Sequence, residues 1–147
     1  MAVSMSLTPF AMAALYSVWQ GKRARLCLAQ NSGSLTKTST TSQWDAAEIS
    51  GNGYSRYIWT VPAGAYDATL DRFQAAIETA TFTASANGGG LNWNAAYLVL
   101  GTISGSNTTW DTSPTAVFSE SPSVALAPGE PRGYAIRLLT DEVIVAA

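Results

Sequence analysis

The sequence predicts a mainly β fold: an antiparallel β-sandwich or jelly roll of about eight short strands with one N-terminal α-helix. Two observations predict it. After residue 23, short segments rich in β-branched and aromatic residues recur at roughly even spacing, and Gly-, Pro-, Ser- or Asn-rich turns separate them. The length of 147 residues suits one domain that needs no covalent staple. We therefore expect a single domain over 1–147, with the sandwich from about residue 23 to 146.

A short helix is predicted over residues 9–20. Thr8 offers a hydroxyl N-cap, Pro9 suits the first helical position, and Gly21 is a stop signal. Apolar side chains fall on more than one face of this helix, so it has to be covered on several sides. Three of its aromatic residues are candidates for an interface with another protein: Phe10, Tyr16 and Trp19.

From Arg23 to Ala29 the pattern changes to the two-residue period of a strand. The single cysteine, Cys27, lies in this strand, so no intrachain disulfide can form and we expect a buried small side chain. The basic residues Lys22, Arg23 and Arg25 follow the helix closely and are expected to favour its C-terminal end. Residues 31–43 have the Ser, Thr, Asn and Gly composition of a loop.

Further strands follow a turn at 51–53. An aromatic strand is expected over 54–61, and a second one over 75–84. A Gly-rich connection at 86–90 leads into the nearly continuous apolar segment 93–100, which is expected to be a central strand covered on both faces. Four more short strands are predicted in the C-terminal part, at 115–119, 123–126, 132–139 and 142–145.

The chain carries little recognisable chemistry. Histidine is absent, which removes the usual general base and the commonest metal ligand, and no cofactor fingerprint occurs. Acidic residues are paired at Asp67/Asp71 and Asp141/Glu142, where glycoside hydrolysis or calcium binding is the alternative to simple turn formation. We favour turn formation and expect no enzyme, no metal and no cofactor.

Charge is sparse and excludes some partners. Charged residues make up 12% of the chain, against about 25% in average globular proteins, and the net charge is −2. Without a basic face, nucleic acid is not an expected partner, and the longest apolar segment, 10–19, is too short to span a membrane. Low charge indicates either a subunit covered by partners or a small domain kept soluble by Ser and Thr.

The aromatic residues have three interpretations: core packing, an interface, or stacking against sugars in a carbohydrate-binding module. Several lie beside amide or carboxyl groups, as a glycan site requires, and Trp44, Trp59 and Trp110 are the candidates for glycan contact. With the three helix residues above, the candidates for the interface are Trp44, Arg56, Tyr57 and Trp110.

Glu48 to Arg56 is the most distinctive segment. Gly51 and Gly53 allow a sharp turn, after which Arg56 can form a bidentate pair with Glu48 as a structural lock, or can instead contact a neighbouring subunit. Together with 25–29, an Ala/Thr/Phe strand at 76–83 and the Val124–Glu130 segment, it resembles a family of small virion structural proteins of tailed phages. The chain departs from that family in a longer loop at 102–113 and in Tyr57, where Gln is usual.

The resemblance implies a structural, non-enzymatic role in the virion. We expect a capsid decoration or cement protein that bridges capsid subunits, with the major capsid protein or other virion proteins as partners and a homotrimer as the assembly. A tail, baseplate or fibre-adaptor component is the alternative within that class. A carbohydrate-binding module for host recognition is the alternative outside it.

Overall fold

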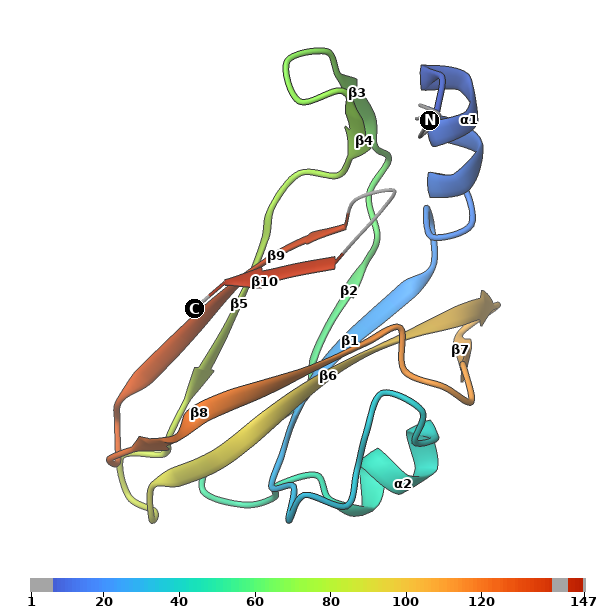
Figure 1. The fold of residues 1–147 in the computed structure, drawn as a ribbon. Coiled ribbons are helices and arrows are strands. Elements are labelled where there is room, and N and C mark those ends of the chain that lie inside the picture. The colour runs from blue at the N-terminus through green and yellow to red at the C-terminus, as the bar shows by residue number, and fades with distance from the viewer. Residues whose placement is uncertain (1–6, 139–142, 147) are drawn as a thin grey trace, which may run out of the picture.

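The chain is mainly β in the computed structural model, which describes residues 7–138 and 143–146, and this confirms the predicted fold class (Figure 1). The sheets are antiparallel, and a helix precedes them. The described elements are α1 (Pro9–Tyr16), β1 (Arg23–Ala29), α2 (Thr41–Ala46), β2 (Tyr57–Thr60), β3 (Ala65–Asp67), β4 (Arg72–Gln74), β5 (Glu78–Thr83), β6 (Leu91–Ser104), β7 (Asn107–Trp110), β8 (Ala116–Leu126), β9 (Pro131–Leu138) and β10 (Val143–Ala146).

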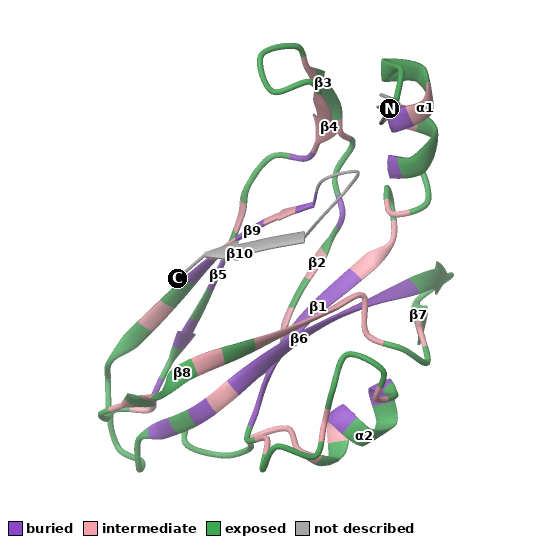
Figure 2. Cartoon of the chain, in the orientation of Figure 1, coloured by how far each residue is buried: buried purple, intermediate pink, exposed green. Residues whose placement is uncertain are grey.

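The main sheet is built around β6, which has 14 residues. One edge of β6 pairs with β1, and β2 lies outside β1. The other edge pairs first with β8 and then with β7, so Leu98 lies between Leu26 of β1 and Ala116 of β8. Buried side chains run along β1 and β6 (Figure 2). The predicted central strand is therefore confirmed, and its apolar sequence follows from having neighbours on both faces.

A second sheet, in the order β10–β9–β5, packs on one face of the main sheet. Apolar side chains from both sheets meet between them, as in a sandwich. The one polar contact at the centre is satisfied, because the Trp93 indole N–H donates to the Tyr134 hydroxyl at 2.8 Å and that hydroxyl donates to Glu120. The buried members of this core are Leu26, Leu28, Ala80, Phe82, Ala84, Leu91, Trp93, Ala96, Tyr134 and Ile136.

The opposite face of the main sheet is covered by α2 and the loop before it. Trp44 of α2 is 2% exposed and its ring lies 5.5 Å from that of Tyr97. The helix begins at a capping box, in which the Thr40 hydroxyl accepts from the Gln43 backbone N–H and the Gln43 side chain accepts from the Thr40 backbone N–H. The sheet is thus covered on both faces.

A lobe formed by α1 and the β3–β4 hairpin extends from one end of the sandwich (Figure 1). Tyr16 is fully buried there, its ring 5.3 Å from Phe73, and its hydroxyl donates to the Pro62 carbonyl. Gly64 permits this packing, since a Cβ at that position would lie 2.5 Å from the Phe73 ring and 2.9 Å from the Tyr16 ring. The aromatic contact therefore joins the two parts of the lobe, and Tyr16 also packs with Val61 and Leu98 of the body.

Two helix predictions need correction. The first helix ends at Tyr16 rather than at residue 20, because the next residues form tighter turns that close with Gly21 at a φ of +77°. The Ser17 hydroxyl also bonds the carbonyl of Ala14. The predicted loop 31–43 contains the start of α2, which the composition of the loop did not suggest.

The strand predictions need smaller corrections. The strand predicted over 54–61 is present as the shorter β2. The strand predicted over 75–84 is present as β5, and a separate short strand, β4, precedes it. The predicted loop 102–113 contains the hairpin of β6 and β7, and β8 joins the strands predicted at 115–119 and 123–126. Residues 139 and 142, at the ends of two predicted strands, lie outside the described residues.

Candidate functional site

The seven residues predicted to form an interface do not come together in one patch. Phe10, Tyr16 and Trp19 belong to the α1 lobe. Trp44, Arg56 and Trp110 lie near the face of the main sheet that α2 covers. Tyr57 lies at the sheet edge on β2, where it packs on the central core and its hydroxyl donates to Glu78. Tyr16 and Trp44 are buried within the chain, so in this conformation they are core residues and unavailable to a partner.

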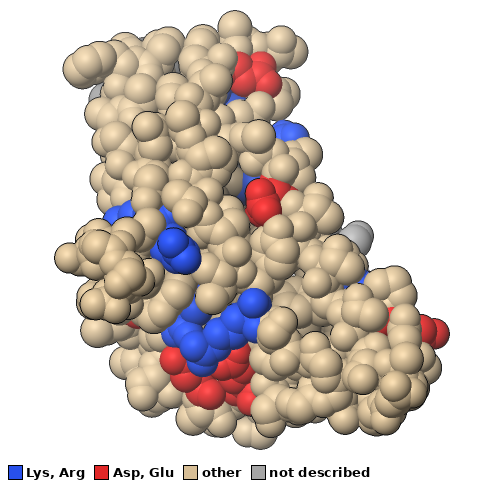
Figure 3. Space-filling view, turned by 180° about the vertical axis from the view of Figure 1, so that it is seen from behind, with Lys and Arg blue, Asp and Glu red and all other residues tan. Residues whose placement is uncertain are grey.

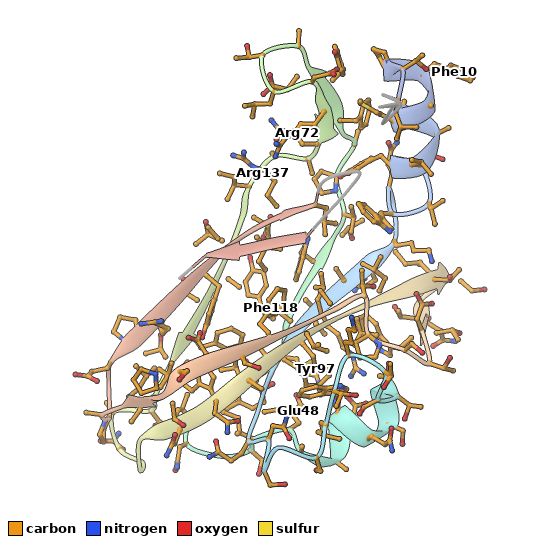
Figure 4. The ribbon with its side chains drawn as sticks, in the orientation of Figure 1. Phe10, Glu48, Arg72, Tyr97, Phe118 and Arg137 are labelled. Atoms are coloured by element: carbon orange, nitrogen blue, oxygen red, sulfur yellow. The ribbon has the colours of Figure 1, made fainter. Side chains whose placement is uncertain are left out.

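The exposed face of α1 gathers several exposed apolar side chains on one short element. The Phe10 side chain is 85% exposed and points away from the body (Figure 4). Val18 is 60% exposed, and Leu7 and Leu15 are about half exposed. The first charged residue in the sequence is Lys22. Nothing ionic therefore interrupts this face, which we call the α1 face: Leu7, Phe10, Ala11, Ala14, Leu15 and Val18.

The other side of α1 is held firmly. The Thr8 hydroxyl caps the helix by accepting from the Ala11 backbone N–H at 3.2 Å. Met12 and Tyr16 are buried, and Trp19 packs edge-on against Tyr16 with ring centroids 5.9 Å apart. We expected α1 to be covered on several sides, but among the described residues the rest of the chain covers only the side of Met12 and Tyr16. The α1 face remains open among the described residues.

A second candidate is a cluster of ionic side chains between α2 and the main sheet, which we call the ionic cluster: Arg25, Asp45, Glu48 and Arg56. Arg25 projects from β1, is 2% exposed, and donates from Nη2 to both oxygens of Asp45 at 3.0 and 2.9 Å. Tyr97 also donates to Asp45, at 2.7 Å, and the Arg25 guanidinium lies 4.8 Å from the centre of the Trp110 ring.

The predicted pair between Glu48 and Arg56 is confirmed. Arg56 Nε donates to Glu48 Oε1 at 2.9 Å, and Nη2 donates to Oε2 at 2.6 Å, which is the bidentate geometry. Tyr54 adds a third donor to the same carboxylate at 2.6 Å. The turn that brings them together has positive φ at Gly51 and Gly53, as predicted. Arg56 Nη2 also lies 3.8 Å from Asp45 Oδ1, which joins the two pairs.

Hydrogen bonding and burial raise the pKa values of the side chains that donate to the carboxylates of the ionic cluster. The hydrogen bond to Glu48 raises the pKa of Arg56. Burial is the largest cause that raises the pKa of Tyr54 and of Tyr97, and the carboxylates they bond add to it. Burial also raises the pKa of Cys27 to about 12, in agreement with the predicted inert side chain. Arg56, Tyr54 and Tyr97 therefore keep their protons near neutral pH and remain donors to the two carboxylates.

Sequence reasoning missed half of this cluster. Arg25 lies on the predicted strand 23–29, as β1, but its side chain bonds Asp45, 20 residues away, where we expected it to favour the helix C-terminus. No local pattern links the two, because their contact depends on how α2 docks on the sheet. The capping box at Thr40 and Gln43 would have revealed α2 itself. Figure 3 shows basic and acidic atoms meeting on one face whose remainder is largely uncharged.

The hollows and acidic pairs carry little chemistry. A shallow hollow of about 480 Å³ lies beside β3 and β4, and its one carboxylate, Asp67, is occupied by two turn N–H groups and by Gln74. Turn formation is thus confirmed for Asp67, while Asp71 accepts from Tyr66. The predicted pair at 141 and 142 lies outside the described residues. Within 7–138 and 143–146, no three His, Cys, Asp or Glu side chains gather as a metal site would require.

None of Trp44, Trp59 and Trp110, the candidates for glycan contact, forms an open aromatic surface on which a sugar could stack. Trp44 is buried, and the Arg25 guanidinium lies over the Trp110 ring. Trp59 packs on both the central core and the core below α1. In the part of the chain that the structure describes, no helix is long and apolar enough to cross a bilayer. The α1 face and the ionic cluster are the two features left to interpret.

Comparison with protein-family models, curated proteins and solved structures found no match. The resemblance to small virion proteins of tailed phages therefore stays a prediction from the sequence. The α1 face and the ionic cluster are therefore the features of this protein that bear on its function.

Proposed function

We propose that this chain is a virion structural protein that acts by adhesion, as a capsid decoration protein that bridges capsid subunits. The observation that carries the proposal is the α1 face, an uncharged apolar surface on a helix whose other side is fixed to the body. A monomeric protein rarely exposes such a surface without a partner. The proposed partners are the major capsid protein and further copies of this chain, with three copies as the expected assembly.

The physical role of this surface is burial. Covering Phe10 removes one of the largest apolar side chains from water, and each fully covered side chain of this size contributes about 1.5–3 kcal/mol. The contributions recur at each position where a decoration protein sits on a shell. A modest contact repeated over many copies then opposes the separation of capsid subunits.

The ionic cluster supports the same proposal in a different way. A protein that holds two neighbours together has to transmit force without deforming, and the cluster fastens α2 and the 48–56 segment to the main sheet. The polar loop before α2 is also fastened. Asn31 and Asn94 exchange two hydrogen bonds of 2.7 Å. We therefore place the attachment at α1 rather than at the loop.

Quantitative mass spectrometry of purified virions from the phage that encodes the chain tests the proposal. A copy number close to that of the major capsid protein supports a decoration protein. A ratio of a few per cent overturns the capsid assignment and favours the tail, baseplate or fibre-adaptor role. Absence from virions overturns the structural role, and binding to isolated glycans, lost on Trp110→Ala, would then favour the carbohydrate-binding module.

A further inference from the structure

We propose that the α1 face is covered by the α1 face of another copy of this chain. The inference rests on the proposed role as an assembling subunit and names the partner at that surface. It starts from the spacing of the exposed residues. Ala11 and Ala14 are three residues apart on one side of α1, Leu7 comes just before its N-cap, and Val18 follows in the turn after its end. These four residues form a row along α1 and its two ends. Phe10 and Leu15 flank this row.

The shape of the row suits a second helix. Ala11 and Ala14 are small and lie at the middle of the row, so a helix that crosses here can approach closely. The larger side chains of Leu7, Phe10 and Val18 lie toward the ends and can pack beside the partner helix. The eight residues of α1 span about 12 Å at 1.5 Å per residue, long enough for one helix crossing.

The absence of charge favours a copy of the same chain over an unrelated partner. In a symmetric contact the same surface lies on both sides, so a charged residue near the two-fold axis would meet its own like charge. The α1 face has no charged residue, and the first one in the sequence is Lys22, beyond its end. Steering toward a different protein ordinarily relies on complementary charge, and this face offers none.

The available area is sufficient for a reversible contact. The four large exposed side chains and two alanines present on the order of 500 Å² on each copy, so two faces together bury on the order of 1,000 Å², the lower bound for a specific interface. We therefore expect association that depends on concentration in the micromolar range rather than a permanent dimer. Three helices meeting through the same face would bury more for each copy.

Sedimentation of the purified full chain from about 1 to 100 μM tests the contact. We expect the mass of the wild-type protein to rise from one copy toward two or three. Phe10→Asp is expected to weaken association at least tenfold, because it removes a large apolar side chain and places an unpaired charge in the contact. Ile77 is also half exposed but lies in the connection between β4 and β5, so Ile77→Asp is the matched control and should associate as the wild type does.

Mixing gives the decisive result. Ala14 lies near the middle of the row, where a residue meets its own copy in a symmetric contact. Ala14→Lys or Ala14→Asp alone should remain a single copy, but an equimolar mixture of the two should recover association, because opposite charges meet only if the two α1 faces meet each other. A wild-type mass of one copy throughout, or no recovery in the mixture, overturns the inference. This outcome is separate from the virion measurement: a single-copy protein found in virions refutes only the contact, and a self-associating protein absent from virions refutes only the proposed function.

Discussion

The pair formed by Glu48 and Arg56 gives a quantitative prediction. Two unit charges at about 4 Å attract by about 4 kcal/mol at an effective dielectric constant of about 20. The Arg56 side chain is 38% exposed and that of Glu48 is 10% exposed, so solvent screens part of this attraction. Fully exposed pairs contribute about 0.2–1 kcal/mol. For this half-buried bidentate pair we expect a coupling energy of about 1–2 kcal/mol.

A double-mutant cycle measures that energy. Glu48→Gln keeps the shape of the side chain and removes its charge, and Arg56→Met keeps most of the aliphatic stem. The free energy of unfolding is measured for the wild type, both single variants and the double variant by urea denaturation, followed through tryptophan fluorescence. We expect each single variant to lose stability and the double variant to lose less than the sum.

The control is an exposed ion pair on the same protein. Lys22 Nζ lies 3.7 Å from Asp111 Oδ2, with side chains 27% and 43% exposed. The cycle through Lys22→Met and Asp111→Asn should give a coupling energy within about 0.5 kcal/mol of zero. A coupling below about 0.3 kcal/mol for the Glu48–Arg56 cycle would refute the lock, because the two side chains would then act independently.

Two further predictions concern packing and pH. Gly90→Ala should destabilise the protein by about 2–3 kcal/mol, since its Cβ would lie 2.1 Å from the Leu126 carbonyl oxygen, whereas Gly133→Ala, with no atom nearer than 4.0 Å, should change the midpoint of urea unfolding little. Burial raises the pKa of Tyr16 and Tyr134 to about 12. The unfolded chain therefore loses these protons at a lower pH than the folded chain, and the free energy of unfolding should fall as pH rises from about 10 to 12. Titration of the folded protein, followed by ultraviolet absorbance, tests this. If all tyrosines titrated near pH 10, the result would contradict the prediction.

The sequence determined the elements whose signals are local. The period of two from Arg23 to Ala29 predicted β1, and the unbroken apolar segment at 93–100 predicted that β6 is central. Thr8 and Pro9 fixed where α1 begins. Even the Glu48–Arg56 pair was predictable, because its members are only eight residues apart and join across a glycine turn.

Only the tertiary structure decided which aromatic side chains are buried and which ionic groups meet. In the sequence, Tyr16 and Phe10 were equal candidates for an interface. In the structure Tyr16 is fully buried against the β3–β4 hairpin and Phe10 is 85% exposed, because the hairpin covers a single side of α1. Arg25 and Asp45 meet because α2 docks on β1, across 20 residues of sequence. The local sequence pattern indicates which residues have to be buried or paired. The packing of elements distant in the chain determines which of them are buried or paired in the structure.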